Sequence, residues 1–148
     1  MTGYDVRLRF IRDWLFERLI QPVESGPWQV RIVDGSTFFR RRRDRKNATG
    51  LLCGDCSTVF INGCSHDDLM LILLHECVHI IFEDAIVDNT PPRWGDQRAR
   101  DYSEDRTMEL EEELFYALTS FQRRRLFRCL AKAKRLKRRS YWDDCPGH

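Results

Sequence analysis

The chain lacks any long apolar run. Nowhere in its 148 residues do about 20 apolar side chains follow one another without interruption, which is the length that a membrane-spanning helix requires. The first twenty residues carry charges throughout, unlike the apolar centre of a secretory signal peptide. The sequence therefore predicts a cytoplasmic protein that makes no use of a membrane.

Histidine is scarce, internal repeats are absent, and nothing indicates an oxidising compartment. Because the chain shows no sign of secretion, we expect free thiols rather than disulfides. Cys53 and Cys56 form a lone CxxC, and Cys64 and His66 could add two ligands to a second metal site there. Ordinary cysteines in a turn are the alternative. The six cysteines are Cys53, Cys56, Cys64, Cys77, Cys129 and Cys145.

The composition predicts one packed domain, since 42% of the residues are hydrophobic and 32% are charged. Its charges are segregated. Residues 40–46 carry +5 and residues 122–148 carry +8, whereas residues 47–121 carry −11. We expect a main domain over residues 1–121 and a basic helical extension of it over 122–148. The basic segments could bind nucleic acid or an acidic partner, although no base-stacking aromatic residues are interleaved with them.

Hydrophobic periodicity predicts an α+β fold. Apolar residues at spacings of three and four predict a helix over residues 5–20, and alternation predicts strands over 28–33 and 58–61. Ser65 and Asp68 resemble a capping box, which predicts that a buried helix begins near His66 and continues to about Phe82. A polar loop should then reach about residue 102, and a third helix should run from 103 to 121.

The buried helix contains His75, Glu76 and His79 in the pattern HExxH. Two histidines four residues apart lie on one helix face, so both imidazoles can reach a single zinc ion. Glu76 would lie beside them as a general base toward a zinc-bound water. Burying these side chains in an apolar segment would be costly without compensation, which favours a metal over a chance match.

Catalytic zinc requires a third protein ligand, and no histidine follows His79 at a short spacing. The next helix carries a cluster of carboxylates. On a helical projection, Glu113 and Glu111 lie at the two edges of the apolar sector and Glu112 points away. The clustered residues are Glu109, Glu111, Glu112 and Glu113.

The order of these parts, with Leu73-Leu74-His75-Glu76-Cys77-Val78-His79 after the strand at 58–61, resembles the ImmA/IrrE-type zinc metallopeptidase-like proteins that are common in phages. The resemblance implies a minimal zincin-like fold, in which the HExxH helix packs against a glutamate-bearing helix. It also implies that the ligand glutamate precedes small or apolar residues at set positions, which selects Glu113. Some members of that family cleave a regulatory protein.

The sequence thus predicts zinc-dependent hydrolysis of a protein or peptide, with His75, His79 and Glu113 as ligands and Glu76 as the base. Two alternatives stay open. One is a non-catalytic metal-containing protein that binds nucleic acid or a partner through its basic surfaces. The other is a SprT-like protease associated with nucleic acid.

Overall fold

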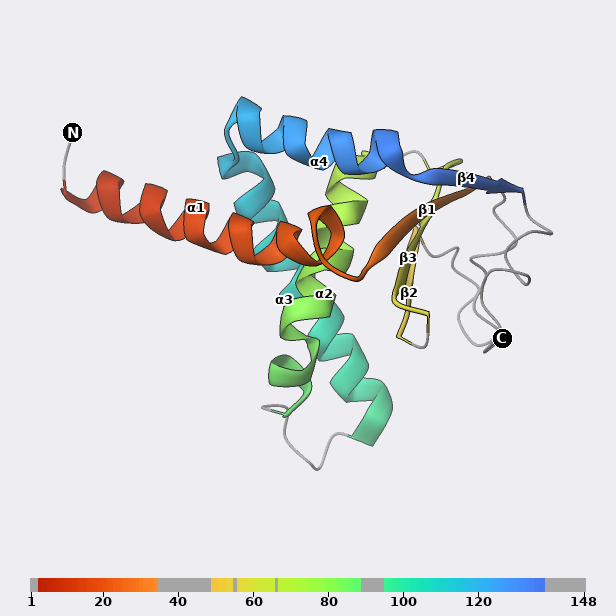
Figure 1. Ribbon diagram of the computed structural model, residues 1–148. Helices are drawn as coiled ribbons and strands as arrows, with labels where there is room; N and C mark the ends of the chain where they lie inside the picture. The colour runs from red at the N-terminus through yellow and green to blue at the C-terminus, as the bar shows by residue number, and fades with distance from the viewer. Residues whose placement is uncertain (1–2, 35–48, 55, 66, 89–94, 138–148) are drawn as a thin grey trace.

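The computed structural model describes residues 3–34, 49–54, 56–65, 67–88 and 95–137. The predicted α+β class is confirmed by helices and a small mixed sheet (Figure 1). In chain order the elements are α1 (Gly3–Glu24), β1 (Gln29–Asp34), β2 (Gly50–Cys53), β3 (Thr58–Asn62), α2 (Leu69–Asp88), α3 (Gly95–Ala117), α4 (Ser120–Lys132) and β4 (Lys134–Lys137). None of the helices described has the length and apolar character to cross a membrane.

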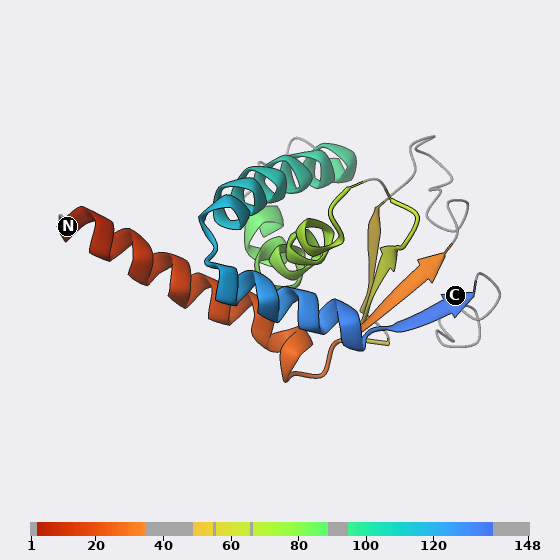
Figure 2. The same cartoon turned by 90° about the horizontal axis from the view of Figure 1, so that it is seen from above.

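The sheet has the strand order β2-β3-β1-β4. β3 pairs antiparallel with β2 and parallel with β1, while β4 adds to β1 in parallel at the far edge. Every residue of β3 is buried, as expected of an interior strand covered on both faces. The helices lie to one side of the sheet (Figure 2). The described part of β2 pairs only with β3, so β2 is an edge strand.

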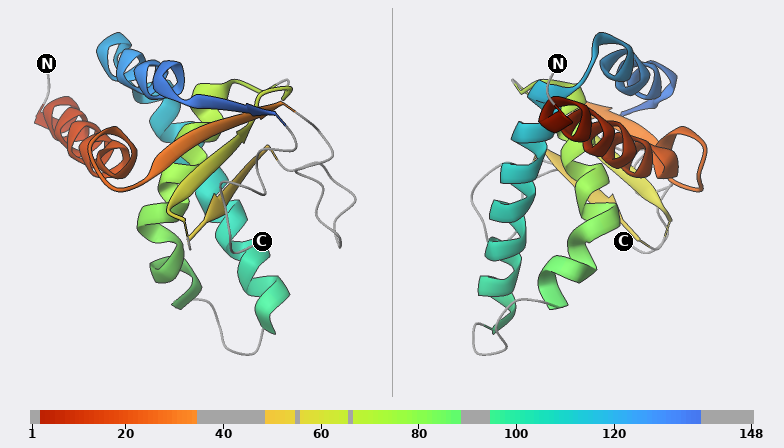
Figure 3. Two further views of the ribbon diagram at one scale, coloured as in Figure 1. Left: turned by 45° about the vertical axis from the view of Figure 1, so that its right-hand side comes forward. Right: turned by 90° about the vertical axis from the view of Figure 1, so that its left-hand side faces the viewer.

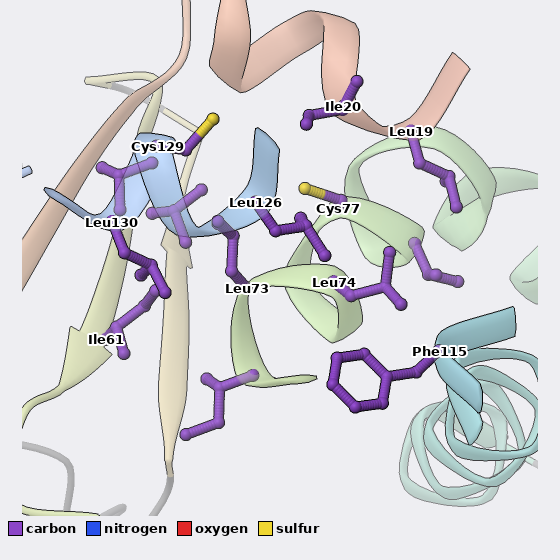
Figure 4. Close-up of a cluster of buried hydrophobic side chains, with 14 of the residues drawn as sticks. Leu19, Ile20, Ile61, Leu73, Leu74, Cys77, Phe115, Leu126, Cys129 and Leu130 are labelled. Atoms are coloured by element: carbon purple, nitrogen blue, oxygen red, sulfur yellow. The ribbon is translucent and has the colours of Figure 1, made fainter. Parts of the chain in front are cut away.

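The helix α2 lies at the centre of the molecule, where α1, α3, α4 and the sheet all pack against it (Figure 3). Its Leu73, Leu74, Cys77 and Val78 are at most 1% exposed. Figure 4 shows the side chains of Leu73, Leu74 and Cys77 among others from four elements, namely Leu19, Ile20, Ile61, Phe115, Leu126, Cys129 and Leu130. Burial on most sides explains why α2 is apolar almost all round.

Arg125 of α4 fastens α1 to the rest of the molecule. Its guanidinium pairs with Glu17 and with Glu24 of α1, and it lies 5.3 Å from the ring centre of Phe16. The amino-terminal half of α1 extends away from the other elements (Figure 1) and leaves several of its apolar side chains exposed.

The start of α2 differs from the predicted capping box. The hydroxyl of Ser65 accepts a hydrogen bond from the amide of Asp67 at 3.2 Å, within the turn that precedes the helix. The carboxylate of Asp68 accepts one from the amide of Met70 at 2.9 Å. Because α2 begins at Leu69, Asp68 is its cap, and the helix starts three residues later than predicted.

The carboxy-terminal region also differs from the predicted single helix. α3 begins at Gly95, within the stretch predicted to be a loop, and ends at Ala117. Thr119 then begins α4 with a capping box that it forms with Gln122. The helical extension expected over 122–148 stops at Lys132, because residues 134–137 complete the sheet as β4.

Candidate metal site

The two histidines of the HExxH motif face each other on α2. The Nε2 atoms of His75 and His79 are 3.1 Å apart. Two zinc-nitrogen bonds at a tetrahedral angle would separate such atoms by about 3.3–3.4 Å. Without a cation the same distance suits a hydrogen bond between the rings. The observed 3.1 Å thus suits a hydrogen bond and is about 0.2–0.3 Å shorter than the spacing of two ligands on one zinc ion.

The side chain of Glu76 extends from α2 to β2, the edge strand of the sheet. Its residue is 6% exposed, and Gly50 of β2 leaves the space that its carboxylate occupies. A Cβ atom built on Gly50 would lie only 2.6 Å from Oε1 of Glu76. An alanine at position 50 would therefore displace this carboxylate. Gly50 is a site residue that the helix-centred motif does not reveal, because it lies on a strand outside that motif.

The glutamate of α3 that contacts His75 is Glu111. Its Oε2 lies 2.7 Å from Nδ1 of His75, and the Glu111 residue is 7% exposed. By contrast, Glu113 and Glu112 are exposed. The structure thus brings together His75, His79 and Glu111, and the carboxylate of Glu76, the next residue along α2, lies near Gly50.

The break after Ala117 explains this difference. The prediction of Glu113 assumed one helix through residue 121, with Ala117 and Phe121 on its buried face. Both of those residues are exposed, and Phe121 belongs to α4. The buried face of α3 instead carries Thr107, Glu111, Leu114 and Phe115. These lie three or four residues apart, so Glu111 points toward α2 along with them.

The chemistry of this cluster suits a cation. Glu111 is nearly buried against His75, and Glu76 is a second nearly buried carboxylate on α2; burying a carboxylate charge is costly unless it is paired. A carboxylate that accepts a hydrogen bond from Nδ1 fixes the tautomer in which the imidazole presents its Nε2 lone pair to a metal. Oε2 of Glu111 lies within ion-pair distance of that nitrogen but outside hydrogen-bond geometry. Within the described ranges no three such donors converge on one point as they stand. The histidine pair fits two ligand positions, and Glu111 lies on the other side of the His75 ring.

The remaining predicted residues lie elsewhere. Cys77 packs in the core, away from the histidines, and burial raises the pKa of its thiol (Figure 4). Tyr116 is 74% exposed on the side of α3 away from Glu111. The proposed ligand His66 lies outside the described residues, so the second metal site with Cys53, Cys56 and Cys64 stays a prediction. The basic segment 40–46 also lies outside them.

Comparisons with known proteins identify no relative, because no family model, no curated protein and no solved structure matches this chain.

Proposed function

We propose that the chain is a zinc-dependent metallopeptidase of minimal zincin-like architecture. The observation that carries the proposal is the pair of facing Nε2 atoms, 3.1 Å apart, with the buried carboxylate of Glu76 next to them in sequence. His75 and His79 would hold the ion. When bound there, zinc would acidify a water molecule and polarise the substrate carbonyl.

Glu76 acts as the general acid and base. Its carboxylate takes a proton from the attacking water as the new carbon-oxygen bond forms, and it delivers that proton to the amine nitrogen as the carbon-nitrogen bond breaks. This role requires a carboxylate in a fixed place. The close approach of Glu76 to Gly50 holds it in such a place.

We assign Glu111 to the positioning of His75 and not to the metal, because its Oε2 lies 2.7 Å from Nδ1, on the far side of that ring from Nε2. Glu111 therefore does not replace Glu113 as the third ligand. To reach the histidine pair, the side chain of Glu113 would have to extend around α3 from its exposed side. From the Nδ1 side the carboxylate helps to position the His75 ring, so substituting Glu111 should weaken metal binding through that effect.

The edge strand β2 supports a peptide as substrate. Among the described residues of the chain, β3 is the neighbouring strand of β2, and Gly50 of β2 lies next to Glu76. An extended peptide can pair with such an edge through its main chain. That pairing would bring a carbonyl group of the peptide toward Glu76, whatever side chains the peptide carries. The expected substrate is therefore a protein segment with few sequence requirements.

The test compares wild type with Glu76→Gln. Both proteins should bind zinc, and only the wild type should cleave a mixture of unstructured peptides followed by mass spectrometry. Glu112→Gln is the matched control, because Glu112 is an exposed glutamate of α3, and it should cleave like wild type. Equal cleavage by wild type and Glu76→Gln, or no cleavage by zinc-loaded wild type, would refute the peptidase proposal.

A further inference from the structure

A groove lies between the end of α1, the start of β1 and one side of α4, and it shares no residue with the candidate metal site. Its volume is about 470 Å³, which is within the range of ligand-binding pockets. α1 and α4 lie next to each other in this region (Figures 1 and 2). The metallopeptidase proposal gives this groove no role.

The groove carries an excess of positive charge. Arg125 lines it, but the guanidinium is neutralised by its ion pairs with Glu17 and Glu24. Three further cations line the groove, namely Arg31, Arg128 and Lys132. In the part of the chain that the structure describes, none of these three forms an ion pair. Arg31 donates hydrogen bonds to the side chain of Gln29 and to the carbonyl of Val30 and keeps its positive charge. Arg128 and Lys132 are exposed, so both can contact an anionic ligand.

Two aromatic side chains lie among these cations. Trp28 at the entry to β1 is half-buried, and Phe121 at the start of α4 is 60% exposed. The sequence separates Trp28 from the basic segment 122–148, which Phe121 directly precedes. The fold brings Trp28 to Arg128 and Lys132, about one hundred residues later in the chain. Phe121 lies about two turns before Arg128 and about three turns before Lys132 on α4.

We propose that this groove binds single-stranded nucleic acid. A base would stack on Trp28 or Phe121, and the backbone phosphates would contact Arg31, Arg128 and Lys132. Aromatic faces interleaved with cations are the combination that such binders use, since every base has a stacking face and every nucleotide a charge. In a duplex the bases are already stacked on one another, so a single strand fits this lining better.

The test measures binding of a fluorescently labelled 20-nucleotide single strand to the full chain by anisotropy, over a range of salt concentrations. We expect Arg128→Ala combined with Lys132→Ala to make the logarithmic salt dependence of affinity shallower by about 1.4, because two phosphate contacts are lost. The matched control is Arg7→Ala combined with Arg9→Ala. It removes the same charge from exposed positions of α1 and should leave the slope unchanged.

Trp28→Leu should weaken binding by about 5- to 150-fold, the effect of losing one stacking platform. Trp14→Leu is its control, because Trp14 is 51% exposed on α1 and does not line the groove. Trp28→Phe keeps an aromatic face and should retain most of the affinity. Circular dichroism melts check that each variant folds, and Trp28→Phe tests the stacking role if Trp28→Leu does not fold.

Three results would overturn the proposal. The first is no binding by wild type at low salt. The second is an equal loss in the groove variants and in their α1 controls, which would indicate diffuse attraction by the basic surface. The third is equal competition by duplex DNA and by the single strand.

Discussion

Gly50→Ala should separate catalysis from both folding and metal binding. The added Cβ would lie 2.6 Å from Oε1 of Glu76, whereas an ordinary contact is at least 3.4 Å. The carboxylate must therefore move by roughly 0.8 Å, the difference between the two distances. A displacement of about 1 Å in a reacting group can cost about 100-fold in rate. We expect peptide cleavage to fall by about that factor.

The same substitution should cost little in stability. Alanine in a strand is favoured over glycine by about 0.5–1 kcal/mol, and shifting a flexible glutamate side chain costs about 0.5–1.5 kcal/mol. The free energy of unfolding in urea should thus change by less than about 1 kcal/mol. Zinc stoichiometry should stay unchanged, because Glu76 is not a proposed ligand.

Gly54→Ala is the matched control, since a Cβ at Gly54 would meet nothing within 4 Å. It should cleave peptides like wild type. If Gly50→Ala keeps full activity, the carboxylate of Glu76 does not need the position that the structure gives it, and the reasoning fails.

Further predictions follow from other contacts. Glu111→Gln should weaken zinc binding by about 10- to 100-fold in competition with a chelating dye, while Glu113→Gln should not; the reverse ranking would restore Glu113. Arg125→Ala should lower the free energy of unfolding by about 1–2 kcal/mol in urea, and an unchanged value would show that its pairs are solvated. The hydrogen bond from Arg125 lowers the pKa of Glu24 below its ordinary value of 4.5. The ionised Glu24 carboxylate therefore adds its full share to the free energy of unfolding above pH 4.5, and that share is lost as the pH falls through the lowered pKa. Arg125→Ala should remove that acid dependence from urea titrations. Leu73→Ala should cost about 2–5 kcal/mol in the same assay, because Leu73 is fully buried; a smaller loss would indicate a core that relaxes.

Much of the fold could be predicted from periodicity. The helix α1, the strands β1 and β3 and the buried helix α2 follow from local spacing of apolar residues, because each buries one face or nearly all of its surface. β4 could not be predicted, since its residues 134–137 read as part of a basic helix. They form a strand because β1 offers an open edge, which is a tertiary cause.

The site shows the same division. The positions of His75 and His79 follow from the 3.6-residue period of one helix. The identity of the partner glutamate depends on how α3 is rotated against α2, and that rotation depends on the break at Thr119. If one helix is assumed to run through residue 121, its apolar sector includes Ala117 and Phe121 and lies nearer to Glu113. The observed helix α3 ends at Ala117, and its buried sector includes Glu111. Gly50 lies on a different element, and no local pattern connects it to Glu76.

The central claim is tested most directly by counting zinc bound to the purified chain in equilibrium dialysis against buffered zinc. Wild type should bind one tightly held ion that His79→Ala loses. If wild type binds no zinc, or if His79→Ala binds it equally well, His75 and Glu111 form a buried ion pair without a metal, and the account is contradicted.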